Sequence, residues 1–147
     1  MIAYFDTSAL VKRYVQEADS DQVLALWSTA QARAVSRLAF AETFSAARRK
    51  QRERPDAHAV VETSLAEFGR DWRTFLIVEL TADLDDSIQR LLADHALKAA
   101  DSIHLASCLA LSERLDQSLV FACWDEALLQ AARAEGLSTL PEEQSSY

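Results

Sequence analysis

Short apolar segments alternate with longer segments of helical periodicity along this 147-residue chain, and this alternation limits what it can fold into. The expected strands are residues 2–5, 33–36, 76–80, 118–123 and 138–140. Consecutive parallel strands need a long crossover, usually a helix, whereas antiparallel strands can be joined by tight turns. The sequence therefore predicts an α/β fold in a single domain, 1–147: a helix-rich, three-layer α/β/α sandwich around a short, mainly parallel sheet.

Helices are expected between these strands, at 7–17, 19–32, 37–54, 56–75, 81–97, 98–114 and 124–136. Pro55 ends the third of them, so residues 37–75 should form a helical hairpin. One arm of this hairpin carries an apolar stripe at helical spacing. The stripe consists of Val61, Leu65, Phe68, Trp72 and Phe75. We expect it to pack partly inside the monomer and the hairpin to serve as a partner-binding or dimer region, and we expect residues 141–147 to form a mobile tail.

Composition restricts the partners and the compartment. The net charge of −8 and the pI of about 4.8 by themselves disfavour binding to nucleic acid, whose phosphates attract positive surface. However, five of the 15 basic residues lie within "RRKQRER", residues 48–54. The two cysteines, Cys108 and Cys123, have neither metal-site nor disulfide spacing, as is typical of the cytoplasm. No segment approaches the ~20 apolar residues that span a membrane, so no membrane association is expected.

Four acids occupy positions that invite a chemical explanation. Asp6 directly follows the apolar "IAYF", and Asp125 follows "LVFACW". Ligands of open parallel sheets bind beyond the carboxyl ends of the strands, where these two acids would share a crevice. Glu42 lies on a helix face of mostly small residues, and Asp101 lies in an otherwise apolar helix. Asp6 and Asp125 could simply be helix N-caps, and Glu42 could be a solvated surface residue. A buried Asp101 is harder to explain, because buried acids are rare unless they are paired or bound to a metal.

Gathering four carboxylates in one crevice has an electrostatic consequence. Two carboxylates about 4 Å apart repel by roughly 4 kcal/mol at an effective dielectric constant of 20. Such a set must take up protons or bind a cation, and all-oxygen ligands favour a hard ion such as Mg²⁺ or Mn²⁺. Ions held in this way activate water and stabilise the leaving oxygen in phosphodiester cleavage.

Four ordered segments carry a resemblance to a known family. They are "IAYFDTSALVK", "SRLAFAETFSAARR", "LKAADSIHLASCLAL" and "LVFACWDEALLQAARAEGL". In order and spacing the chain resembles the PIN-domain nucleases, specifically the VapC-type toxins of bacterial toxin–antitoxin pairs. The resemblance covers essentially the whole chain. A lone D-T-S would be weak support, whereas four ordered blocks in a chain of this length are specific.

The resemblance implies a cytoplasmic, metal-dependent endoribonuclease that hydrolyses RNA and is neutralised by a cognate VapB-type antitoxin wrapped around the helical region. It further implies a homodimer. The implied metal ligands and catalytic residues are Asp6, Glu42, Asp101 and Asp125, holding one or two Mg²⁺ or Mn²⁺ ions, with Ser8 as a supporting hydrogen-bonding residue. The chain departs from the family at Cys123, where a Thr or Ser two residues before the last acid is common.

Basic residues near the acids suggest how RNA would be bound. Arg49 lies two helical turns beyond Glu42 on a similar side of the helix, where it could guide a phosphate backbone toward the acids. The expected nucleic-acid-binding residues are Arg48, Arg49, Lys50, Lys12 and Arg13. The alternative is a solvated helix end whose cations oppose the negative helix terminus. His104, on a packed helix, is expected to be a core or supporting residue rather than a general base.

Two other functions remain open from the sequence. A phosphatase of the haloacid-dehalogenase type would also place an Asp after the first strand, but it would need a second Asp at the position of Ser8 and a later phosphate-binding Lys. A non-catalytic scaffold that binds RNA or protein is the other alternative, and Cys123 leaves it open. Binding of Mn²⁺ through the carboxylates distinguishes the nuclease from the scaffold.

Overall fold

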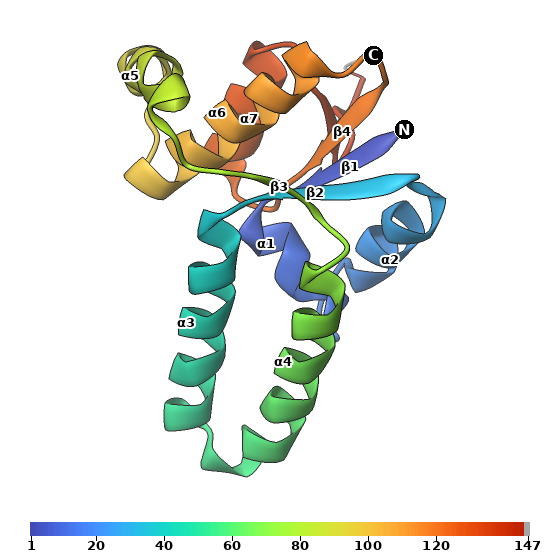
Figure 1. The fold of residues 1–147 in the computed structure, drawn as a ribbon. Coiled ribbons are helices and arrows are strands. Elements are labelled where there is room, and N and C mark those ends of the chain that lie inside the picture. The colour runs from blue at the N-terminus through green and yellow to red at the C-terminus, as the bar shows by residue number, and fades with distance from the viewer. Residues whose placement is uncertain (146–147) are drawn as a thin grey trace.

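The computed structural model describes residues 1–145 and contains a five-stranded, fully parallel sheet in the order β3-β2-β1-β4-β5 (Figure 1). The strands are β1 (Ile2–Phe5), β2 (Ala32–Ser36), β3 (Leu76–Val78), β4 (Leu119–Ala122) and β5 (Ser138–Leu140). Strand β1 is central: Ile2 pairs with Ala32 of β2 on one side and with Leu119 of β4 on the other. The predicted parallel α/β architecture is therefore confirmed.

Helices cover both faces of the sheet, which completes the three layers. Alternate residues of β1 point to opposite faces, with Tyr4 in one buried cluster and Phe5 in the other. The first cluster packs the sheet against α5 (Asp85–Asp94), α6 (Ala99–Arg114) and α7 (Glu126–Ala134). The second packs it against α1 (Thr7–Leu10), α2 (Ser20–Thr29), α3 (Leu38–Glu53) and α4 (His58–Trp72). Strands buried on both faces read as continuous apolar runs, as "IAYF" does.

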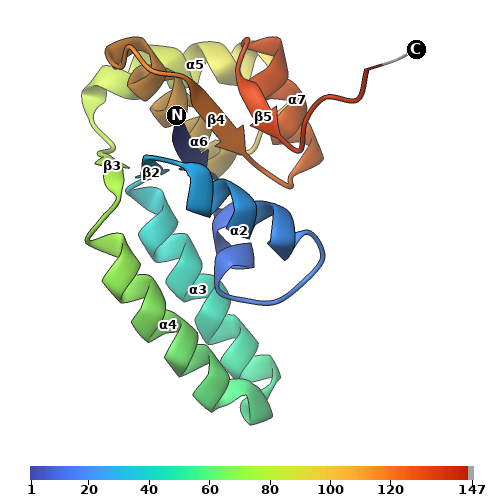
Figure 2. The same ribbon diagram turned by 90° about the vertical axis from the view of Figure 1, so that its right-hand side faces the viewer.

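The helical hairpin consists of α3 and α4 and projects from one face of the sheet (Figures 1 and 2). A short 3₁₀ turn, η2 (Pro55–Ala57), joins its two arms at the predicted break. Every residue of the predicted apolar stripe is buried; Phe68 is 1% exposed and packs against the rings of Tyr14, Phe40, Phe44 and Trp72. The stripe thus packs within the monomer, and three of its members, Val61, Leu65 and Phe68, also line a groove between the hairpin and η1 (Val11–Arg13).

Most predicted helices are shorter at their ends than their periodicity suggested, and the segments 7–17 and 81–97 differ most. The first ends in the 3₁₀ turn η1 (Val11–Arg13) rather than at residue 17. The chain leaves the helix there because Tyr14 docks on α4, with its ring against Phe68 and its hydroxyl donating to Asp71 at 2.8 Å. The segment 81–97 likewise contains the 3₁₀ turn η3 (Ala82–Leu84) followed by α5, which ends at Asp94.

Two remaining features are the lengths of the helices and the contacts at the start of the C-terminal tail. Among the described residues, no helix is both long and apolar enough to cross a bilayer. The carbonyl of Pro141 accepts hydrogen bonds from Arg133 at 2.9 Å and from Thr139 at 2.7 Å, so the expected tail is tied down at its first residue. Residues 146–147 of that predicted tail lie outside the described residues.

Candidate active site

Asp6 lies between the end of β1 and the start of α1, and the residue is 4% exposed. It caps the helix, since its Oδ2 accepts from the Ser8 backbone N–H at 3.2 Å, and it also accepts from the Ser8 hydroxyl at 2.6 Å. Capping and a chemical role are compatible here because only one of the two carboxylate oxygens makes these contacts. The local sequence D-T-S therefore places a buried acid at the carboxyl end of the central strand.

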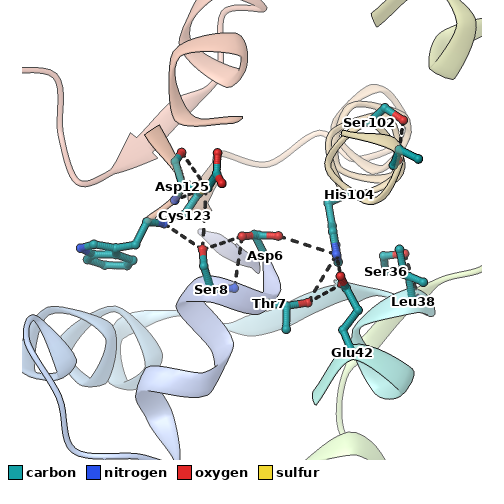
Figure 3. A network of polar contacts seen from close by, with 12 residues as sticks. Asp6, Thr7, Ser8, Ser36, Leu38, Glu42, Ser102, His104, Cys123 and Asp125 are labelled. Atoms are coloured by element: carbon teal, nitrogen blue, oxygen red, sulfur yellow. Dashed lines mark hydrogen bonds and ion pairs between the residues drawn. The ribbon is translucent and has the colours of Figure 1, made fainter. Parts of the chain in front are cut away.

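Ser8 connects the ends of two adjacent strands. Its Oγ donates to Asp6 and accepts from the Trp124 backbone N–H at 2.9 Å, just after β4 (Figure 3). The Asp6 N–H in turn donates to the carbonyl of Ala122 at 3.1 Å. The Ser8 hydroxyl therefore joins the two chain segments that carry Asp6 and Asp125. This is the residue to which the family resemblance gives a supporting role.

Asp125 begins α7, where its Oδ1 accepts from the Leu128 N–H at 3.0 Å. The Asp125 N–H contacts the Cys123 sulfur at 3.3 Å, and the Ser8 hydroxyl lies 3.9 Å from the same sulfur. Burial and the nearby charge of Asp6 raise the pKa of the Cys123 thiol, so it stays a neutral side chain. Cys123 thus stands where the family commonly has a hydroxyl, with its sulfur between the Ser8 hydroxyl and the Asp125 N–H.

Glu42 lies on the first turns of α3 and is joined to two other elements. Its Oε1 accepts from the Thr7 hydroxyl at 2.8 Å and lies 2.5 Å from Nε2 of His104 on α6 (Figure 3). Burial alone would raise the pKa of Glu42, but the contacts with His104 and Thr7 outweigh it and lower that pKa. Glu42 is therefore held as a carboxylate, and it is not simply solvated surface.

His104 is 1% exposed and bridges two of the predicted acids. Its Nε2 is 3.6 Å from Asp6 Oδ1 as well as 2.5 Å from Glu42 Oε1. Burial lowers the pKa of His104, but the hydrogen bond to Glu42 and the charges of Asp6, Glu42 and Asp101 raise it overall. Thr7, which the sequence analysis did not single out, joins this group at 3.3 Å from Nε2. Only its position inside D-T-S could have drawn attention to it.

Asp101 lies in the first turn of α6 and is partly buried. Burial, followed by the negative charges of Asp125 and Asp6, raises the pKa of Asp101. These named influences locate Asp101 in the same electrostatic environment as the acids at the strand ends. Two of the predicted acids, Asp6 and Glu42, are joined through His104. Asp101 is near enough to Asp125 and Asp6 for their charges to raise its pKa.

The predicted basic residues divide into two groups. Lys12 and Arg13 are engaged within the protein: Lys12 binds Glu17 at 3.1 Å, and Arg13 binds Glu67 at 3.1 Å. Arg48 pairs with Glu62 across the hairpin. The remaining two, Arg49 and Lys50, are exposed and make no ion pair within residues 1–145. Among the predicted basic residues, the two that are free to contact a phosphate backbone are therefore Arg49 and Lys50 on α3.

The donor set of this site suits a hard divalent cation. Carboxylate oxygens are the ligands that Mg²⁺ and Mn²⁺ prefer, and the charges of Asp125 and Asp6 add to burial in raising the pKa of Asp101. In the part of the chain that the structure describes, no three His, Cys, Asp or Glu side chains are already arranged to enclose an ion.

Comparison with known proteins identifies the family. Residues 3–119 match the model of the PIN domain. The chain belongs to the PIN-domain family. Within this family it is 39% identical over 144 residues to Ribonuclease VapC45 of Mycobacterium tuberculosis (strain CDC 1551 / Oshkosh), covering 95% of both chains. It is equally similar to Ribonuclease VapC49 of M. tuberculosis (strain ATCC 25618 / H37Rv), which places it in the VapC branch.

Solved structures show the same PIN-domain fold. VapBC2 from Rickettsia felis, bound to a DNA fragment from its promoter, matches with a TM-score of 0.62 at 12% identity, over 88% of this chain and 92% of the other. PAE2754 from Pyrobaculum aerophilum matches with a TM-score of 0.59 at 18% identity, over 96% and 93% of the two chains. At these identities the match concerns the fold. The assignment of individual site residues rests on the geometry described above and stays a prediction.

Proposed function

We propose that this protein is a metal-dependent endoribonuclease toxin that hydrolyses RNA phosphodiester bonds. The observation that carries the proposal is that Asp6 and Glu42 both lie beside the buried His104, while burial and the charges of Asp125 and Asp6 raise the pKa of Asp101. The membership of the VapC branch supports it, because both M. tuberculosis relatives are named ribonucleases.

The four acids would hold one or two Mg²⁺ or Mn²⁺ ions. The proposed ligands are Asp6, Glu42, Asp101 and Asp125. When bound, such an ion supplies an activated water and stabilises the leaving oxygen. The chain's own contribution is to hold the ligands in place: the Ser8 hydroxyl donates to Asp6 and accepts from the Trp124 backbone N–H ahead of α7. The protein would act in the cytoplasm, consistent with its two free, buried cysteines.

The proposed RNA path leads from α3 to the acids. Arg49 and Lys50 project from the same helix as Glu42, about two turns further along. Their charges are not engaged in ion pairs with residues 1–145, so they are available to phosphates, whereas Lys12, Arg13 and Arg48 are engaged within the protein. Phosphate contacts of this kind supply affinity that weakens as salt is raised.

Cleavage of RNA by the purified protein tests the proposal directly. Total cellular RNA is incubated with Mn²⁺, with Mg²⁺ or with EDTA, and Asp101→Asn is compared with the wild type. The matched control is Asp116→Asn, which removes an exposed acid from the loop after α6. Discrete fragments that require metal, persist in Asp116→Asn and vanish in Asp101→Asn support a metallonuclease. Equal degradation by all three proteins identifies a contaminant and contradicts the proposal.

A protein partner would bind the hairpin. A groove of about 630 Å³ lies between the hairpin and η1, and its lining includes Val11, Val15, Ala46, Ala47 and Val60. Val60 is 70% exposed, unlike the buried stripe. We propose that this groove takes an apolar segment of a cognate VapB-type antitoxin. The R. felis VapBC2 complex and a toxin–antitoxin complex from Klebsiella pneumoniae, similar in fold to this chain, support such an assembly.

A second copy of the chain is the other proposed partner. Phe40, Leu76 and Leu80 are large apolar side chains that are 40%, 41% and 50% exposed. A homodimer that covers such side chains would remove apolar surface from water. Light scattering on the purified protein measures the mass of the particle, and a monomer at micromolar concentration would contradict this proposal.

The non-catalytic scaffold remains the second candidate function, because Cys123 stands where a hydroxyl is common. It is distinguished by metal binding: a scaffold would show no Mn²⁺ binding that depends on Asp101. The phosphatase alternative has no support in the site, since Ser8, at the position where a second Asp is needed, uses its hydroxyl to join Asp6 to the Trp124 backbone.

A further inference from the structure

We propose that His104 is a positioning residue that fixes the orientation of the Glu42 carboxylate and thereby sets the affinity of the site for its metal. The inference rests on the proposed function, because it concerns the same four acids. It goes beyond the acids and Ser8 by assigning a role to a buried side chain of α6.

The imidazole of His104 is packed inside the protein with one nitrogen facing the acids. The residue is 1% exposed, and Nδ1 has no hydrogen-bond partner among the described residues. Nε2, in contrast, faces three oxygens: Glu42 Oε1 at 2.5 Å, Thr7 Oγ1 at 3.3 Å and Asp6 Oδ1 at 3.6 Å (Figure 3). Two of these oxygens are carboxylate acceptors, so Nε2 is the nitrogen that carries hydrogen in either charge state of the ring.

This hydrogen bond occupies one defined oxygen of Glu42. Oε1 accepts both from His104 and from the Thr7 hydroxyl at 2.8 Å. None of the hydrogen bonds formed by residues 1–145 uses Oε2, which is therefore the oxygen left for a cation. A Glu side chain that is free to rotate loses much conformational freedom when it is ordered by a ligand. Holding it from two sides before the ligand arrives reduces that loss and so tightens binding.

The same geometry separates positioning from acid–base catalysis. A general base needs a nitrogen that can reach a reacting water, but the Nε2 of His104 is enclosed by Glu42, Thr7 and Asp6. Its Nδ1 is buried on the other side of the ring. His104 therefore acts on the reaction through Glu42, in the way that outer partners of metal ligands orient them.

Mn²⁺ binding, measured by electron paramagnetic resonance of the free ion, tests this role without reference to activity. The informative pair is His104→Gln and His104→Asn: the longer amide can place an N–H near the position of Nε2, whereas the shorter one ends near Nδ1. We expect the Kd for Mn²⁺ to stay within about threefold of wild type in His104→Gln and to rise 10–100-fold in His104→Asn. Ser107→Ala, a buried polar position one turn further along α6, is the control and should leave the Kd unchanged.

A double-mutant cycle with Glu42→Gln shows whether His104 acts through that acid. If it does, adding His104→Asn to Glu42→Gln changes the Kd less than twofold, because the carboxylate that His104 positions is already gone. At Mn²⁺ concentrations near the wild-type Kd, His104→Asn should lower kcat on RNA while KM stays near the wild-type value, since the proposed RNA-binding residues lie on α3; saturating Mn²⁺ should restore kcat.

The outcomes are distinguishable from failure of the proposed function. Mn²⁺ binding by wild type that disappears in Asp101→Asn establishes the metal site on its own. Against that background, equal Mn²⁺ affinity of His104→Gln and His104→Asn, or additive effects with Glu42→Gln, would overturn the positioning role of His104. Absence of Mn²⁺ binding by the wild type would overturn both.

Discussion

Asp101→Asn should make the metal-free protein more stable while abolishing its proposed activity. Burial and the charges of Asp125 and Asp6 raise the pKa of Asp101 in the folded state. An acid whose pKa is raised by folding destabilises the fold at every pH above its unfolded value of about 3.9, because the unfolded chain gives up the proton more readily. Replacing the carboxylate with a neutral amide of the same shape removes that penalty.

The expected magnitude is modest because Asp101 is only partly buried. Partly exposed charge pairs contribute about 0.2–1 kcal/mol each, so relief from two like charges amounts to about 1 kcal/mol. For a domain of this size, 1 kcal/mol corresponds to a rise in Tm of roughly 2–4 °C. The effect should be largest at about pH 8 and low salt, and it should shrink as pH falls toward about 4 or as salt screens the charges.

Calorimetry in EDTA, with Asp116→Asn as the control, measures this difference. Saturating Mn²⁺ should reverse the order, since wild type gains the free energy of metal binding and the variant loses a ligand. A Tm for metal-free Asp101→Asn at or below that of wild type at pH 8 would refute the argument that the acids crowd one another. An equal gain in Asp116→Asn would assign the effect to net charge instead.

Three further results are expected. Phe68→Ala should lower the free energy of unfolding by about 3–5 kcal/mol in denaturant titrations, because it empties the centre of the aromatic cluster between α3 and α4; a loss below 1 kcal/mol would contradict that packing. Ser8→Ala should reduce RNA cleavage 10–100-fold because the hydroxyl orients Asp6, and it should lower Tm because the hydroxyl also joins Asp6 to the Trp124 backbone. Wild-type cleavage would show that the hydroxyl is dispensable. Val60→Asp should weaken binding of the cognate antitoxin at least about tenfold, by titration calorimetry, and leave cleavage unchanged; unchanged affinity would move the antitoxin away from this groove.

Most of the fold was predictable because its signals are local. Apolar runs such as "IAYF" mark strands buried on both faces, and Pro55 marks the turn of the hairpin. The first helix was predicted too long because its end depends on Tyr14 reaching Asp71 on α4, a contact between residues far apart in the chain. Periodicity alone could not reveal that the chain leaves the helix at η1 to make it.

Some residues of the candidate site could likewise be predicted from local sequence signals, and others could not. Asp6 and Asp125 could be assigned to one edge of the sheet because Asp6 directly follows β1 and Asp125 comes three residues after β4, and parallel strands end at one edge. Thr7 was missed because its partner Glu42 is brought to it only by the packing of α3 beside α1. The contact of His104 with Glu42 was likewise invisible, since it joins α6 to α3 across the end of the sheet.

The central position of β1 also governs when the site can exist. Strand β1 is made first, yet its neighbour β4 comes from the last third of the chain, with Ile2 opposite Leu119. Until that segment has left the ribosome, Asp125 cannot approach Asp6, and β1 lacks one of the two strands that pair with it. Pairings this distant in sequence also form slowly. A chain built in this order can complete the proposed set of acids only after β4 and the start of α7 have been made.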